Sequence, residues 1–208
     1  NVESKPIKSF PSLKDKFVCF SMSQWNNRKG FDLLVKSFYI EFFNNPDAFL
    51  VIKTYMNAMN LKKGDMAKQR EYITNQILQI KNSIKKDNQL SKAKILVVCD
   101  IIQYEHISWL YEQSDVFVLA TRGEGFGLTI SEAIMHEKPV MVPDFGGHVD
   151  YLDPKNSFVF SGNFMPYLGS PEHDYDMLYY EPNILEVCEK LRQCYNIWSE
   201  DPMKLKDM

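Results

Sequence analysis

The sequence lacks several features that would assign it to whole classes of protein. No apolar run approaches the roughly 20 residues that a bilayer-spanning helix needs, and the first residues contain no signal-peptide core. Basic residues are not in excess: 24 Lys and Arg stand against 27 Asp and Glu, and the net charge of -3 argues against a nucleic-acid partner. What remains is a chain of 208 residues, 45% of them hydrophobic, which is enough for one well-buried core.

The cysteines are scattered, and none has the spacing of zinc ligands. Cys19 and Cys99 lie inside apolar runs, where a free thiol packs as a small hydrophobic group. Reduced thiols are typical of the cytoplasm, so we expect a cytoplasmic protein without disulfides or a bound metal.

Short apolar runs rich in β-formers alternate with helical patterns along most of the chain. Strands are expected at residues 17–22, 49–55, 94–99, 116–120, 139–143 and 157–160. Helices are expected at residues 30–43, 66–86, 104–113, 128–136 and 183–198. The strands are almost wholly apolar, as in a parallel sheet that helices cover on both faces. This alternation predicts an α/β fold with a doubly wound, mainly parallel Rossmann-like sheet and a C-terminal closing helix.

The same patterns divide the chain into three parts. The polar residues 1–16 are expected to form a linker that follows a further N-terminal domain, residues 17–182 the Rossmann-like domain, and residues 183–208 the closing helix and tail. Ligands of such sheets bind beyond the carboxyl ends of the strands. The loops at that edge are expected at residues 23–29, 54–60, 100–105, 121–127 and 144–149.

The loop at residues 121–127 carries the strongest chemical signal. Gly123, Gly125 and Gly127 leave a buried strand and enter a helix, and glycine lets backbone N–H groups approach a ligand. The helix N-terminus adds a partial positive charge, so the turn suits a diphosphate. Glu124 and Glu132 would repel a bare diphosphate but suit the hydroxyl groups of sugars on either side of it. The alternative is an ordinary helix start, with Glu132 facing solvent.

The segment from Glu124 to Ala133 resembles the E-x7-E signature of retaining GT-B glycosyltransferases, especially glycosyltransferase family 4. Further matches follow the order of that family at residues 28–34 (RKGFDLL), 111–120 (YEQSDVFVLA), 138–140 (KPV) and 146–151 (GGHVDY). The resemblance covers most of the chain. It implies the second Rossmann-like domain of a two-domain enzyme, whose acceptor-binding domain would precede Asn1.

The resemblance also implies a role for each matching residue. Lys29, helped by Arg28, is expected to neutralise the diphosphate of a nucleoside diphosphate sugar, and Glu132 to accept hydrogen bonds from ribose hydroxyls. Glu124 is expected to be the catalytic residue and to hold the sugar. The remaining residues expected to bind the donor are Gly125, Phe126, Gly127 and Leu128. Ile102, just past a strand, is a candidate for an apolar contact with the nucleobase.

The expected function is transfer of a hexose from a nucleoside diphosphate sugar, with retention of configuration and without a cofactor or metal. The stretch from Trp25 to Asp32 favours a guanosine diphosphate sugar, with mannose as the first candidate. Two positions depart from the pattern: Gln24 stands where many members of family 4 have Arg, and Asp150 where many have Glu.

Two other functional classes remain open at this point. The first is a non-catalytic sugar-nucleotide module, or a degenerate partner subunit, of the same fold. The second is another two-domain enzyme on this architecture, such as a phosphorylase or a sugar-nucleotide epimerase. A Rossmann oxidoreductase is disfavoured, because it needs a G-x-G-x-x-G directly after the first strand and only Gly30 occurs there.

Overall fold

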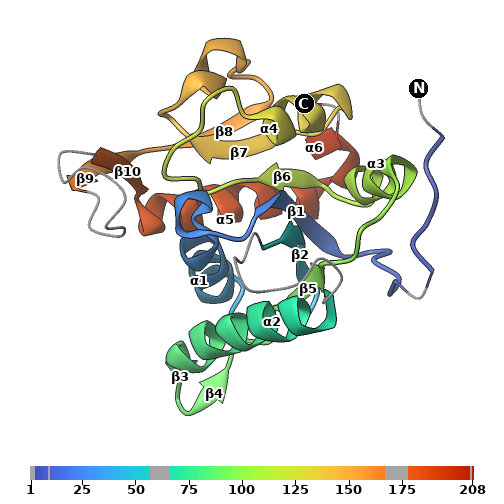
Figure 1. Ribbon diagram of the computed structural model, residues 1–208, viewed down its shortest axis with the longest axis vertical. Helices are drawn as coiled ribbons and strands as arrows, with labels where there is room; N and C mark the ends of the chain where they lie inside the picture. Colours follow the sequence, from blue (N-terminus) through green and yellow to red (C-terminus); the bar gives the residue numbers. More distant parts are fainter. Residues whose placement is uncertain (1–2, 9, 57–65, 167–177, 207) are drawn as a thin grey trace.

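A six-stranded parallel sheet forms the centre of the protein, seen in a computed structural model that describes residues 3–8, 10–56, 66–166, 178–206 and 208. Its strands are β1 (Phe17–Gln24), β2 (Ala48–Tyr55), β5 (Lys94–Val98), β6 (Val116–Val118), β7 (Val140–Pro143) and β8 (Ser157–Phe160). They lie in the order β5-β2-β1-β6-β7-β8, which Figure 1 shows from β8 near the top to β5 lower down. The predicted α/β class and parallel sheet are confirmed.

Helices cover both faces of this sheet. One face carries α1 (Phe31–Glu41), α2 (Met66–Ser83) and α5 (Ile184–Glu200), and the other carries α3 (Tyr104–Glu112) and α4 (Leu128–Met135). Shorter turns are the 3-10 helices η1 (Asn27–Lys29) and η2 (Gly147–Tyr151) and the terminal helix α6 (Pro202–Lys206). Among the described residues, none of these helices has the combined length and hydropathy that crossing a bilayer requires.

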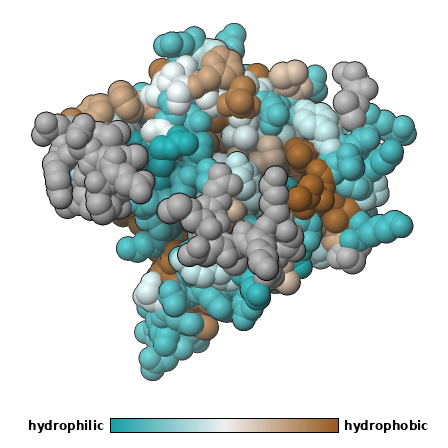
Figure 2. Space-filling model, viewed as in Figure 1, coloured by the Kyte–Doolittle hydropathy of each residue, from teal (hydrophilic) through white to brown (hydrophobic). Residues whose placement is uncertain are grey.

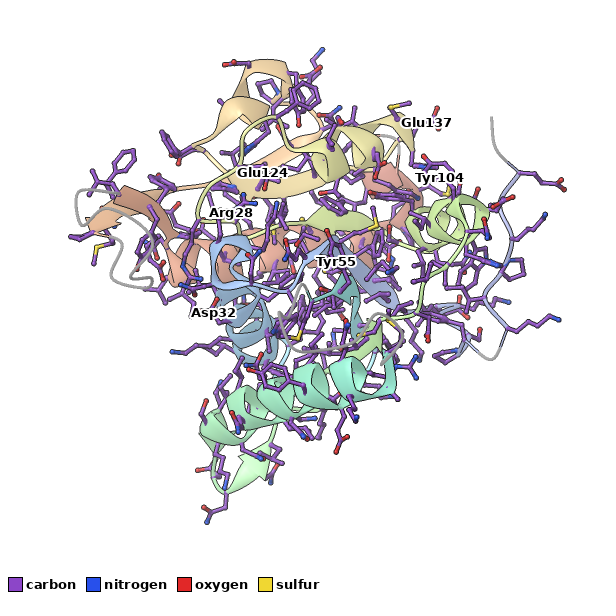
Figure 3. All side chains as sticks on the ribbon, in the orientation of Figure 1. Arg28, Asp32, Tyr55, Tyr104, Glu124 and Glu137 are labelled. Carbon is purple, nitrogen blue, oxygen red and sulfur yellow. The ribbon has the colours of Figure 1, made fainter. Side chains whose placement is uncertain are left out.

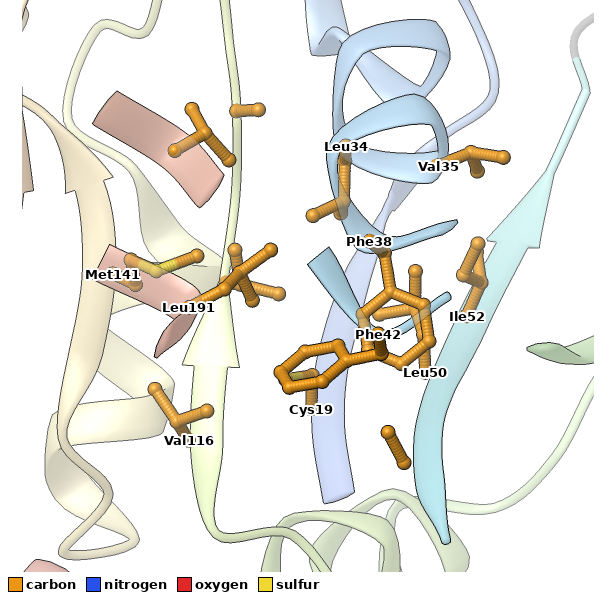
Figure 4. Packing of buried hydrophobic residues seen from close by; sticks show 14 of the residues in the cluster. Cys19, Leu34, Val35, Phe38, Phe42, Leu50, Ile52, Val116, Met141 and Leu191 are labelled. Carbon is orange, nitrogen blue, oxygen red and sulfur yellow. The ribbon is translucent and has the colours of Figure 1, made fainter. Parts of the chain in front are cut away.

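The packing of α1 shows how the apolar pattern produces the fold. Leu34, Phe38 and Phe42 recur at helical spacing, and each is at most 3% exposed. They face the side chains of β1 and β2, among them Cys19 (Figure 4). Full burial of one such side chain contributes roughly 1.5–3 kcal/mol. The burial of α1 therefore fixes the position of the η1 turn that precedes it.

The long helix predicted at residues 66–86 is too long at its C-terminal end. Helix α2 stops at Ser83, and a small hairpin follows, made of β3 (Lys85–Lys86) and β4 (Gln89–Leu90). Asp87 and Asn88 form its turn with φ values of 50° and 61°. Asp and Asn tolerate this left-handed conformation better than most residues, and two consecutive residues with positive φ suit a tight hairpin. Lys85 and Lys86 therefore lie on a strand and not in the helix.

The N-terminal segment, predicted as a linker, packs against the domain. Residues 3–8 and 10–16 contain neither helix nor strand, yet Leu13 is only 6% exposed. The ring of Phe10 meets Trp109 edge to face at 5.3 Å, and the Lys5 N–H donates to the Glu105 carbonyl at 3.0 Å. These contacts attach the segment to α3.

A second hairpin, which the sequence patterns did not predict, follows β8. Strands β9 (Gly162–Pro166) and β10 (Leu178–Pro182) pair antiparallel, and the connection between them lies outside the described residues. The hairpin returns the chain to the ligand edge, where the Tyr180 N–H donates to the Arg122 carbonyl at 2.9 Å. Helix α5 then begins, with the Asn183 side chain accepting from the Leu185 N–H as its N-cap.

Candidate active site

A cavity of about 700 Å³ opens at the carboxyl edge of the sheet, where the loops after β1, β2 and β6 meet. Its lining consists of Met22, Ser23, Gln24, Arg28, Lys29, Lys53, Tyr55, Ile107, Glu124, Gly125, Phe126, Gly127, Leu128, Thr129 and Glu132. Hydrophobic and hydrophilic residues lie beside one another on this side of the molecule (Figure 2). Of the loop predicted at residues 54–60, only residues 54–56 are described.

The glycine-rich turn leads from β6 into the N-terminus of α4. Gly127 is the N-cap, with φ 79°, and no side chain caps the helix. The leading N–H groups of an uncapped helix lack partners within the helix and carry partial positive charge. Because Gly125 to Thr129 line the cavity, this helix start provides a suitable place for an anion.

The cations reach the cavity from η1, directly before α1. Gly30 makes this approach possible: its φ is +64°, and a Cβ there would lie 1.8 Å from the Ala120 carbonyl oxygen. The Lys29 ammonium lies 2.5 Å from a Glu124 carboxylate oxygen, with both side chains nearly buried. Arg28 donates to the Gly123 carbonyl at 2.5 Å and lies 3.6 Å from Glu124. Figure 3 shows Arg28 and Glu124 next to one another, with Tyr55 close by.

Glu132 enters the cavity from the second turn of α4. Burial raises the pKa of its carboxyl group above the usual 4.5, while the hydrogen bond from Tyr111 acts in the opposite direction. The Tyr111 hydroxyl donates to Glu132 at 3.4 Å and to the Thr129 carbonyl at 3.1 Å. Tyr111 therefore positions one of the two carboxylate oxygens of Glu132, a residue that lines the cavity.

A second glycine-containing turn, which follows β7, packs directly against the glycine-rich turn after β6. The Gly147 N–H donates to the Glu124 carbonyl at 3.2 Å, and a Cβ on Gly147 would lie 2.2 Å from the Gly125 carbonyl oxygen. The Tyr151 hydroxyl donates to the Phe126 carbonyl at 2.7 Å. Only glycine permits this approach of one turn to the other. The conformation of the glycine-rich turn thus depends on a segment about 20 residues further along the chain.

His148 supports this junction from the core. It is fully buried, and its Nε2 lies 2.9 Å from the Pro143 carbonyl oxygen, so Nε2 carries the proton. Burial lowers the pKa of His148 below 6.5, so its ring is neutral at physiological pH. Its Nδ1 has no hydrogen-bond partner among the described residues.

Arg122 connects the turn to three further elements, η1, α1 and β10. Its guanidinium pairs bidentately with Asp32 of α1 at 2.7 and 2.8 Å, and with Glu181 of β10 at 2.5 and 3.1 Å. The same group donates to the Asn27 carbonyl at 2.6 Å. The side chain of Arg122 is only 7% exposed. One buried cation therefore holds η1, the glycine-rich turn and the C-terminal hairpin together.

The comparisons with known proteins agree with this geometry. The sequence profile of glycosyl transferases group 1 matches residues 3–165. The chain belongs to this family. No curated protein matches the sequence significantly.

Solved structures show the corresponding fold. A UDP-forming α,α-trehalose-phosphate synthase from Burkholderia xenovorans superposes with a TM-score of 0.62 at 14% identity, over 94% of this chain and 40% of that one. The C-terminal domain of the group 1 protein LpcC from Francisella tularensis gives 0.55 at 19% identity, over 91% and 78%. Both indicate one Rossmann-like half of a GT-B fold. The chain spans 40% of the length of the synthase.

The structure of this group 1 domain brings most of the expected site residues together. Lys29, Glu124 and Glu132 line one cavity, as do the other residues expected there: Arg28, Gly125, Phe126, Gly127 and Leu128. Ile102 does not line it. That side chain packs against the core under α3, and Ile107, one helical turn into α3, lines the cavity instead.

Several residues that shape the site were not foreseen from the sequence. The contacts of Arg122 have no signal in the sequence, because Asp32 lies 90 residues and Glu181 59 residues from it along the chain. His148 lies in the matched motif at residues 146–151, which predicts a glycine turn but not the burial of this histidine.

Proposed function

We propose that this chain is the donor-binding half of a retaining glycosyltransferase, which moves a hexose from a nucleoside diphosphate sugar to an acceptor without a cofactor or catalytic metal. An N-terminal acceptor-binding domain would complete the cleft, so this chain alone is expected to bind donor weakly and to transfer little or no sugar. One observation carries the proposal: Lys29, Glu124 and Glu132 converge on one cavity with the uncapped N-terminus of α4.

Charge explains how this arrangement would promote transfer. When the bond between the sugar C1 and the diphosphate oxygen breaks, negative charge grows on the leaving diphosphate. Cations and N–H dipoles already fixed there stabilise that charge more than they stabilise the bound donor. Lys29 and Arg28 are the cations, and the start of α4 supplies the dipole. The oxygen of an acceptor hydroxyl would then bond to C1 on the same face, which retains the configuration, and its proton would pass to the diphosphate oxygen that leaves C1.

The contacts in the unliganded site suggest how the donor would enter. Lys29 is neutralised by Glu124 at 2.5 Å. A diphosphate would compete for the lysine and release the carboxylate, which then accepts hydrogen bonds from the sugar hydroxyls. Glu132, oriented by Tyr111, would accept hydrogen bonds from the ribose. In this scheme Glu124 changes partner when the donor binds, and Glu132 does not.

The donor base is a separate question. Guanosine diphosphate mannose is the first candidate from the sequence resemblance. UDP-glucose is the competitor, because a similar structure is a trehalose-6-phosphate protein from E. coli bound with UDP-2-fluoro glucose. That structure superposes with a TM-score of 0.59 at 13% identity.

Calorimetry with both sugar nucleotides tests the proposal. Wild-type chain is expected to bind at least one, and Glu132→Ala to bind it roughly tenfold more weakly, since a hydrogen bond to a charged group contributes about 1.5–3 kcal/mol. The proposal fails if neither nucleotide binds and the variant is indistinguishable from wild type. Acceptor-dependent turnover by the full-length protein then separates an enzyme from a non-catalytic module of the same fold.

A further inference from the structure

Lys53 lines the cavity and has no hydrogen-bond or ion-pair partner among the described residues. It is the sixth residue of β2, and its paired neighbours on the two adjacent strands are Met22 and Val98. Only 9% of the residue is exposed, and it lines the cavity. Among the described residues, no side chain or carbonyl forms a hydrogen bond or ion pair with its ammonium.

This placement is unfavourable for the protein by itself. Removing an ammonium from water costs free energy unless an anion or acceptor replaces the water. Burial accordingly lowers the pKa of Lys53 below 10.5. Asp100 acts on it only at a distance and is already paired with Arg70. A desolvated cation that faces a cavity is typical of a ligand-binding residue.

The other cations of the cavity differ from Lys53 in this respect. Lys29 is held by Glu124, and Arg28 is bound to the Gly123 carbonyl. Each of these two cations already has a protein partner at hydrogen-bonding distance. Lys53 has no such partner among the described residues.

We propose that Lys53 binds a phosphate oxygen of the ligand directly and is the anion anchor of this cavity. The inference rests on the proposed donor function and extends it to a residue on β2, outside the glycine-rich turn and η1. Lys53 would then attract the diphosphate first, and Lys29 would exchange Glu124 for the phosphate as the donor settles.

Lys53→Met and Lys53→Arg test this role. We expect Lys53→Met to weaken the binding of inorganic diphosphate, UDP and GDP by roughly 10- to 100-fold in calorimetry, and Lys53→Arg to restore most of it. The Tm of Lys53→Met should be unchanged or higher, because an apolar side chain replaces a desolvated cation. Weaker binding together with undiminished stability is a result that a structural lysine would not give.

Lys138 provides a matched control. It is also 9% exposed, but its ammonium lies 3.0 Å from the Ser114 carbonyl oxygen. Lys138→Met should therefore lower the Tm and leave diphosphate binding unchanged.

The possible outcomes separate this role from the proposed function. If wild type binds UDP or GDP and Lys53→Met binds them equally well, or if that variant loses several degrees of Tm, the role of Lys53 is refuted and the donor site stands. If wild type binds no nucleotide but its binding of inorganic diphosphate depends on Lys53, the anchor stands and the donor proposal fails. If wild type binds neither, both fail. If Lys53→Met weakened the binding of a sugar phosphate such as glucose 6-phosphate but not that of UDP, GDP or diphosphate, the assignment of Lys53 to the donor would be overturned.

Discussion

Replacing Arg122 by methionine removes the cation that joins three segments around the cavity. The change keeps an apolar stem of similar length, so the packing of the side chain is largely preserved. It removes the bidentate contacts to Asp32 and Glu181 and the hydrogen bond to the Asn27 carbonyl. We expect a large loss of stability from a residue that does not belong to the hydrophobic core.

The magnitude follows from how exposed each partner is. The Asp32 side chain is 53% exposed, so its charge stays hydrated after the change and the lost pair costs about 1 kcal/mol or less. Glu181 is 30% exposed, and hydrogen bonds to charged groups contribute about 1.5–3 kcal/mol. The sum is about 2–4 kcal/mol. For a domain of this size it corresponds to a Tm lowered by roughly 5–15 °C.

Urea unfolding followed by circular dichroism at pH 7 measures this loss. Lys16→Met is the control, because Lys16 forms an exposed pair with Asp47 that should contribute under about 1 kcal/mol. A loss below about 1 kcal/mol for Arg122→Met would refute the reasoning that this guanidinium holds the segments together. In a double-mutant cycle with Glu181→Gln, the coupling energy between Arg122 and Glu181 should account for most of the lost stability. The coupling energy between Arg122 and Asp32, measured with Asp32→Asn, should be small.

Three further predictions concern the cavity itself. Gly147→Ala should lower the Tm, because its Cβ would lie 2.2 Å from the Gly125 carbonyl oxygen, whereas Gly125→Ala meets no atom within 4 Å and should leave the Tm unchanged in calorimetric scans. The free energy of unfolding should fall as the pH drops below about 6.5, because burial lowers the pKa of His148 and the unfolded chain therefore binds that proton more readily; urea titrations at pH 7.5 and 5.5 should show a smaller change in His148→Gln. Donor affinity should fall as the pH is lowered and Glu132, whose pKa is raised by burial, becomes protonated. Calorimetry on Glu132→Gln should not show this decrease in affinity.

The elements that the sequence predicted well are those whose signal is local. The apolar run of β1 is sufficient to predict a strand. The helical spacing of Phe31, Leu34 and Phe38 is sufficient to predict a helix, because burial of the apolar side chains decides the structure. The glycine-rich turn is predictable for a similar reason, since a glycine cluster between a strand and a helix is a local signal of a tight turn at a helix start. Most of the expected cavity residues follow directly from that turn and from η1.

The parts that sequence patterns missed depend on contacts between distant segments. Charged residues such as Asp32 and Glu181 look like ordinary surface residues until the fold brings both to Arg122. Strand β9 is exposed at four of its five positions and therefore has little apolar pattern from which a strand could be predicted. Ile107 lines the cavity and Ile102 does not. The loop position alone does not determine which of these two isoleucines faces the cavity.

The glycines of the site show why a glycine motif alone does not locate a phosphate. Gly30 and Gly147 are required by the protein, since a Cβ at either position would collide with a backbone carbonyl oxygen. Gly127 is required as well, by its φ of 79° at the start of α4. Gly123 and Gly125 have neither requirement: their φ is not positive, and no atom lies within 4 Å of a Cβ built on them. The folded chain alone does not explain these two glycines, and both belong to the turn whose backbone borders the cavity. Gly125 lines the cavity, and under the proposed donor function close approach of a ligand to its backbone would account for that glycine.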